Sequence, residues 1–367
     1  MAWPTVIIKI LNLMNGPIAG VEYHFLFVIY GTVPQGAERN LIMVDSTTDL
    51  ADKLADANPE GLATITAAQL NGKSEWTAGV MILDEADNWQ DAIHKANEVS
   101  SFEMIALGFD CETKAMIEEA ITVRTELKNQ LGREVGVICQ LPAVTAEQTW
   151  EQWLAAIVDI PKDVASEYIT VVPNVHADGT TLGKYAGRLA NQEVSLADSP
   201  ARVQTGSVLG NTELAKDSAG KTLDLATLRA LESNRIAVPM WYPDYPGQYW
   251  TTGRTLDVPG GDYQDIRHIR VAMKAARKVR IRGIARIGDR TLNSTPGSIA
   301  AAKLYFTQDL RQMALTGVPG EIYPPEDGDI DIKWVSTEEV EIYMSVQPYE
   351  CPVKITIAIS IKQGATS

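Results

Sequence analysis

The segment VMILDEADNWQDAIHKANEVSSFEMIALGFD, residues 80–110, decides how the first half of the chain folds. Its two apolar runs, residues 80–85 and 103–110, have the length and composition of strands that are buried on both faces. Between them, residues 88–99 carry apolar side chains at helical spacing. This order predicts two strands of a parallel sheet, joined by a helix that covers the sheet.

The same alternation continues on both sides of this segment. Further buried strands are predicted at FLFVIYG (25–31), LIMVD (41–45), EVGVICQLP (134–142) and YITVVPNV (168–175), and further helices at 113–131 and 145–160. Thr145, followed by Glu147 and Gln148, resembles a helix start. We therefore expect an α/β outer domain at residues 21–224, with a largely parallel sheet covered by helices.

The sequence changes character after residue 224. A turn-rich segment at 241–250 precedes a helical pattern from about Tyr263, a second one from Ser298 to Met313, and strand-like residues 333–350. This order predicts a smaller α+β inner domain at 225–350.

The two ends of the chain resemble detachable strands, and we treat residues 1–20 and 351–367 as arms. Each arm is set off by Gly or Pro and carries apolar residues at every second position: Val6, Ile8 and Ile10 at one end, and Ile355, Ile357, Ile359 and Ile361 at the other. A strand with one apolar face must pair with a sheet. The arms either complete the sheet of their own chain or exchange with neighbouring subunits.

Composition limits the possible functions. The 367 residues are 45% hydrophobic, enough for two domains, and the net charge of −15 disfavours binding to nucleic acid or anionic membranes. Cys111, Cys139 and Cys351 form no C-x-x-C pair, which argues against a disulfide framework or a zinc site and favours a reducing compartment. We found no signal peptide and no span of ~20 apolar residues, so we expect a soluble protein.

Catalytic motifs are scarce. The segment from Gly179 to Tyr185 resembles a phosphate loop but has one residue too few between its glycines, and a tyrosine where Ser or Thr is needed. His176, beside Asp178 at a strand end, is the best catalytic candidate, although a histidine in a polar turn is usually a surface residue. We expect no catalytic residue, no cofactor and no metal site.

The segment RHIRVAMKAARKVRIRGIARIGDR, residues 267–290, contains nine Lys or Arg residues and one acid, Asp289. Wound as a helix, it gathers its cations on one side, which we call the basic face: Arg267, Arg270, Lys274, Arg277, Lys278 and Arg282. This face could be solvated and paired with acids of its own chain, bind nucleic acid, or dock on an acidic protein surface.

Three segments together resemble the C-terminal part of contractile tail sheath proteins from phages and related particles. They are residues 241–280 with their GRTL motif and basic helix, residues 287–306, and the end EIYMSVQPYECPVKITIAISI at 341–361. A looser resemblance covers LGKYAGRLANQEVSLADSPARV, residues 182–203. The second half of the chain matches well and the first half only in general character.

The resemblance implies a structural subunit, not an enzyme, that forms stacked hexameric rings around a tail tube and contracts to drive the tube through a cell envelope. It implies that both arms lend strands to neighbouring subunits, and that the basic face contacts an acidic tube. Truncating Arg270, Lys274 and Arg277 should then weaken tube attachment. Implied partners are other sheath subunits, the tube protein, and baseplate and tail terminator proteins, in a virion tail assembled in the bacterial host cytoplasm.

Two rival interpretations remain open at this point. A flavodoxin-like enzyme or small-ligand-binding protein would be a discrete monomer or dimer with a ligand at the strand ends. A nucleic-acid binder would show salt-dependent binding through the basic face.

Overall fold

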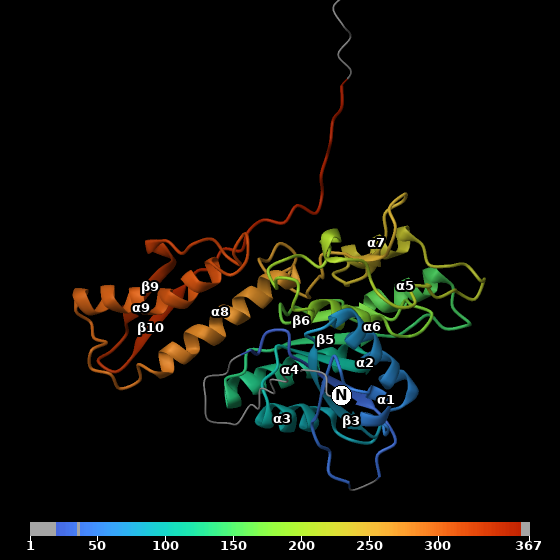
Figure 1. The fold of residues 1–367 in the computed structure, drawn as a ribbon, viewed down its shortest axis with the longest axis horizontal. Coiled ribbons are helices and arrows are strands. Elements are labelled where there is room, and N and C mark those ends of the chain that lie inside the picture. The colour runs from blue at the N-terminus through green and yellow to red at the C-terminus, as the bar shows by residue number, and fades with distance from the viewer. Residues whose placement is uncertain (1–19, 35–36, 361–367) are drawn as a thin grey trace, which may run out of the picture.

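The computed structural model of the chain describes residues 20–34 and 37–360. Figure 1 shows an α/β body from which a limb of two long helices and a β-hairpin extends to one side. The C-terminal segment leaves the limb and runs away from the rest of the molecule (Figure 1).

A six-stranded sheet forms the centre of the body, in the order β2-β3-β1-β4-β5-β6. Its strands are β1 (Phe25–Tyr30), β2 (Ile42–Asp45), β3 (Thr77–Leu83), β4 (Met104–Asp110), β5 (Gly136–Leu141) and β6 (Ile169–Pro173). All neighbouring strands are parallel except β2, which runs antiparallel to β3 at the edge. Every predicted strand of the first half is present, and the prediction of a largely parallel sheet is confirmed.

Helices cover both faces of this sheet. The helices of the body are α1 (Leu50–Lys53), α2 (Pro59–Gly72), α3 (Trp89–Val99), α4 (Lys114–Leu131), α5 (Trp150–Asp159), α6 (Thr181–Leu189) and α7 (Leu225–Ser233), with a short 3-10 turn at Val203–Thr205. The core on one face contains side chains of α3, α4, α5 and α7. The core on the other face contains side chains of α1, α2 and α6, and the first turns of α8 (Ile266–Ile284).

The start of α5 differs from the prediction. The cap is Thr149, whose side chain accepts from the Gln152 amide while the Gln152 side chain accepts from the Thr149 amide. This reciprocal pair satisfies two free N–H groups at the helix start. Thr145 instead lies in a turn closed by the Gln148 side chain and backbone.

The segment after residue 224 packs with the sheet. Leu228 of α7 belongs to one core, and Trp250 of β8 (Tyr249–Trp250), which pairs with β7 (Pro239–Met240), belongs to the other. By packing, the body therefore continues to the start of α8. The functional division into an outer and a tube-facing domain stays a prediction.

The limb consists of the second half of α8, α9 (Pro296–Ala314), a 3-10 turn at Asp327–Asp329, and a hairpin of β9 (Ile330–Trp334) and β10 (Val340–Met344). Phe306 packs against Ile330 and Ile332 of the hairpin. On α8, Met273 faces the body core while Val271 and Ala275 face α9. One continuous helix therefore joins body and limb. Among the described residues, no helix is long and apolar enough to cross a membrane.

Candidate assembly interface

The β9–β10 hairpin is a two-stranded sheet with open edges. Its register pairs Val340 with Trp334 and Met344 with Ile330. Ile330 and Ile332 point to the helices, while Asp331 and Tyr343 are exposed on the other face. Within residues 20–34 and 37–360, no third strand pairs with either edge. Unpaired edges of this kind are templates for another strand.

The C-terminal segment has the complementary property. Ile355, Ile357 and Ile359 are 74%, 77% and 89% exposed, and the segment forms no strand pair with any described residue. Apolar side chains at every second position are suited to a sheet with one buried face. Of the predicted arm positions, Ile361, Val6, Ile8 and Ile10 lie outside the described residues.

The basic face is largely paired inside the chain. Its ion pairs are Arg267 with Asp265 at 3.1 Å, Arg270 with Glu103 at 2.7 Å, Lys274 with Glu321 at 2.6 Å, Arg277 with Glu22 at 3.1 Å, and Arg282 with Asp309. Lys278 alone of the six has no ion pair with a described residue. Intrachain acidic partners, one of the alternatives left open by the sequence, therefore account for the other five.

The pair between Arg270 and Glu103 is the most buried of these. Arg270 donates two hydrogen bonds to the Glu103 carboxylate, at 2.7 and 2.9 Å, and the Tyr23 amide donates a third at 2.6 Å. Burial alone would raise the pKa of Glu103, but the Arg270 charge outweighs it and leaves this pKa below its ordinary value. Removing Arg270 would leave a buried, unpaired carboxylate, so loss of folding stability is its expected effect.

A second set of cations on the limb has no acidic partner among the described residues. Five Lys and Arg side chains there have no ion pair with a described residue: Lys278, Arg280, Arg290, Lys303 and Arg311. Only Lys278 was in the set predicted from the sequence. Helical spacing identifies which side of α8 a cation occupies, but not whether an acid from elsewhere in the chain meets it.

The segment that resembles a phosphate loop has a packing role. A Cβ added to Gly183 would lie 2.0 Å from the Thr64 carbonyl oxygen, so the glycine lets α6 approach α2 closely. The Lys184 ammonium is buried and pairs with Asp178 at 2.8 Å. Gly183 and Lys184 therefore serve helix packing and an ion pair within the chain.

His176 is a buried residue with both ring nitrogens engaged. Nδ1 lies 2.8 Å from the Thr181 hydroxyl and Nε2 lies 2.6 Å from the Gln248 side-chain oxygen. Burial, aided by the Lys184 charge, lowers its pKa to about 4. A histidine held in this way positions its neighbours and has no free nitrogen for a substrate.

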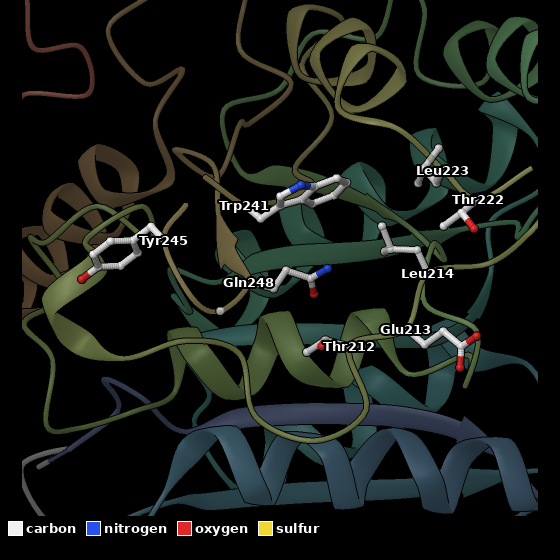
Figure 2. A pocket seen from close by; sticks show the side chains of 9 residues that line it. Thr212, Glu213, Leu214, Thr222, Leu223, Trp241, Tyr245 and Gln248 are labelled. Carbon is white, nitrogen blue, oxygen red and sulfur yellow. The ribbon is translucent and has the colours of Figure 1, made fainter. Parts of the chain in front are cut away.

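A cavity of about 540 Å³ lies near the carboxyl end of β6. Figure 2 shows the Trp241 ring above Gln248, with Leu214 and Leu223 on one side and Tyr245 on the other. In the described part of the chain, no group of three or more His, Cys, Asp or Glu side chains is placed so that it could hold a metal ion.

Both halves of the chain match family models. Residues 3–254 match the N-terminal domain of the DUF2586 family, and residues 262–364 match its C-terminal domain. The boundary between the two models falls just before α8, whose first turns still pack in the body core.

A relative of similar length is known from a phage. The chain is 38% identical over 374 residues to a protein of Haemophilus phage HP1 (strain HP1c1) that is provisionally named a tail sheath protein, with 97% of each chain covered.

Solved structures share the fold at low sequence identity. A sheath tail protein from Listeria innocua superposes with a TM-score of 0.62 at 10% identity, covering 90% of this chain and 92% of that one. A sheath tail protein from Desulfitobacterium hafniense gives 0.57 at 14%, covering 94% and 96%. A chain of the anti-feeding prophage baseplate gives 0.61 at 12%, covering 99% and 100%. The chain therefore belongs to the DUF2586 family and is a member of the phage tail sheath proteins.

Proposed function

We propose that this structural subunit of a phage or pyocin-like tail forms stacked hexameric rings around the tail tube and contracts to drive the tube through the envelope of the target cell. Its partners are then other sheath subunits, the tube protein, and baseplate and tail terminator proteins. Assembly takes place in the bacterial host cytoplasm, and the product is part of the virion.

The observation that carries this proposal is the match between a C-terminal segment that pairs with no described residue and a hairpin whose two edges are open among the described residues. In the proposed exchange, each subunit gives two arms and receives two. A neighbour's residues 354–362 would align with one edge of the hairpin, and the segment TVIIKILNL, residues 5–13, of another neighbour with the second edge. The resulting four-stranded sheet would cover the helices of the limb.

The energetic gain from such pairing is large for a short segment. Each isoleucine that moves from solvent to a sheet core contributes roughly 1.5–3 kcal/mol, and Ile355, Ile357 and Ile359 all start exposed. Main-chain hydrogen bonds to the edge fix the register, because a slip by one residue would turn all isoleucines to the solvent face.

Tube attachment, in this proposal, uses the unpaired cations of the limb. Lys278, Arg280 and Arg290 lie on α8 or just beyond it and have no ion pair with a described residue. The resemblance to sheath proteins implies an acidic tube, so these residues would supply the complementary potential. The five paired residues of the basic face would contribute to tube attachment only indirectly, by stabilising the fold that presents the unpaired cations.

Contraction needs no fuel in this scheme. The extended polymer is metastable, and better contacts between subunits in the contracted state supply the energy. Because many subunits are coupled, a few kcal/mol from each are enough, and 1.4 kcal/mol already changes a two-state equilibrium tenfold.

Electron microscopy of the purified full chain tests the proposal, beside a version that lacks residues 354–367. We expect striated hollow cylinders from the full chain and dispersed subunits from the truncated one. A sharper pair of variants keeps the chain length. Replacing Ile355, Ile357 and Ile359 by Thr keeps the strand propensity but removes the apolar face, whereas Thr356→Ala with Ser360→Ala changes the opposite face.

Cylinders from the alanine control but not from the threonine variant are the expected result. Cylinders from all versions would show that the C-terminal segment does not hold subunits together. Dispersed particles from the full chain would remove the proposal and favour a small ligand in the cavity near Trp241.

A further inference from the structure

The root of the C-terminal arm is fixed to the first turn of α8. The guanidinium of Arg267, which is buried, donates from Nη1 to the backbone oxygen of Tyr349 at 2.7 Å. Asp265, the cap of α8, holds the same guanidinium at 3.1 Å. Arg267 therefore has a fixed orientation when it meets the arm.

Further contacts fix the same root. The Tyr323 amide donates to the Gln347 oxygen at 2.8 Å, and the rings of Tyr323 and Tyr349 lie 4.0 Å apart between centroids. The Tyr323 hydroxyl also donates to Glu350 at 2.9 Å. Beyond Cys351 every residue up to 360 is exposed. The fixed root thus ends close to Cys351, and the free arm begins there.

The root of the N-terminal arm is fixed to the middle of the same helix. The Tyr23 amide donates to Glu103, which is held by Arg270, and Glu22 pairs with Arg277 at 3.1 Å. Arg277 also donates to the Glu134 oxygen at 2.9 Å, which ties this root to the chain just before β5.

We propose that α8 is the mechanical link between the two arms of each subunit, with Arg267 and Arg277 as the residues that position the arm roots. The two residues are ten positions apart, which corresponds to about 15 Å along a helix. Since α8 is one continuous helix, a displacement of one root is passed to the other as a rigid movement. This inference rests on the proposed exchange of arms between subunits.

Methionine variants remove the guanidinium and keep an apolar stem. Arg267→Met should loosen the C-terminal root, and Arg277→Met the N-terminal root. Arg282→Met is the matched control, because it makes the same charge change on the same helix but releases Asp309 of α9. Arg267→Lys keeps a donor and should restore part of the effect. Arg270 is left unchanged, since its loss would endanger folding.

Hydrogen exchange in the full-length subunit measures the roots directly. We expect exchange of the Tyr323 amide to rise about tenfold in Arg267→Met, and that of the Tyr23 amide to rise similarly in Arg277→Met. Amides of β1 should be unaffected in both, which separates loosening of a root from general destabilisation. Unchanged exchange at both roots, or an equal rise in Arg282→Met, would overturn the inference.

Contraction of assembled sheaths measures the link itself. With loosened roots, partly contracted sheaths should become several-fold more frequent in micrographs for Arg267→Met and Arg277→Met, but not for Arg282→Met. If all three contract like the unaltered sheath, α8 is not the link, while arm exchange still stands. If the unaltered full chain forms no sheath, the proposed function fails and the link fails with it.

Discussion

At the scale of single residues, the arginines of α8 are held by acids that are distant in the chain. Arg270 and Glu103 are 167 positions apart, and Arg277 and Glu22 are 255 apart. The sequence correctly placed these cations on one helix. It could not supply their partners, because a pairing over such separations depends on how the whole sheet is assembled.

Two histidines, the buried His176 and the half-buried His24, predict how stability depends on pH. Burial lowers the pKa of His24, and of His176, from 6.5 to about 4. Below pH 6.5 these histidines bind protons in the unfolded chain but stay neutral in the folded chain. The free energy of unfolding is therefore highest above pH 6.5 and falls as the pH drops toward 4. Each histidine should remove up to ~3 kcal/mol over this range. Urea unfolding at pH 7.5, 5.5 and 4.5 measures the loss.

The comparison variant for this prediction is His176→Gln. It should make the free energy of unfolding depend less on pH, whatever the variant does to stability at neutral pH. The prediction would be contradicted if the free energy of unfolding fell by the same amount between pH 7.5 and pH 4.5 in His176→Gln and in the unaltered chain.

At the scale of elements, the close contact between α2 and α6 depends on glycine. Gly183 and Gly187 face α2, where an added Cβ would lie 2.0 Å from the Thr64 oxygen and 2.4 Å from the Ala68 oxygen. Backbone atoms cannot move aside as the end of a flexible side chain can. The spacing that resembled a nucleotide motif therefore serves helix packing.

Gly183→Ala should destabilise the protein by about 1–3 kcal/mol, although alanine normally favours a helix. Gly283→Ala is the matched control, because Gly283 lies in α8 with no atom within 4 Å of its added Cβ, and should stabilise by up to ~1 kcal/mol. The denaturant concentration at the unfolding midpoint, compared with that of the unaltered chain, measures the change in stability of each variant. Equal stabilisation by both would show that α2 and α6 can separate freely.

The sequence predicted secondary structure correctly where apolar runs are long, and missed it where side chains are small. All six strands of the main sheet were predicted, as were α3, α4, α8 and α9. Helix α2, PEGLATITAAQLNG, was missed because alanine, glycine and threonine occupy several of its sides and give no clear polar face. The alternating isoleucines of the candidate arms are visible in the sequence, whereas the hairpin edges without a partner among the described residues are visible only in the structure.

At the scale of the whole molecule, charge is unevenly distributed. The chain carries a net charge of −15, yet the limb offers Lys278, Arg280 and Arg290 without acidic partners among the described residues. Unpaired cations on an acidic protein attract an acidic partner to the surface that carries them. Contacts of such cations are screened by salt, with a Debye length of about 10 Å at 0.1 M.

Reversing the charge of these cations should therefore weaken attachment to the tube without preventing assembly of the sheath. Lys278→Glu combined with Arg280→Glu is expected to reduce co-sedimentation with the tube protein about tenfold at low salt, while sheath polymers still form. Lys53→Glu with Lys216→Glu, exposed positions on the body, is the control for the change in net charge. Attachment that neither weakens in the first variant nor declines with added salt would refute a role for these cations.

Under the proposed arm exchange, the two hairpin edges would give a polymer of this chain two unlike ends. Inside a stack, each edge would hold a neighbour's strand. At one end, strands would project without an edge to pair with, and at the other, edges would be left without a strand. Such a filament would have an inherent direction, and growth at its two ends would be chemically distinct. A protein that stops growth would then have to imitate an edge at one end and a strand at the other, so two different caps would be required.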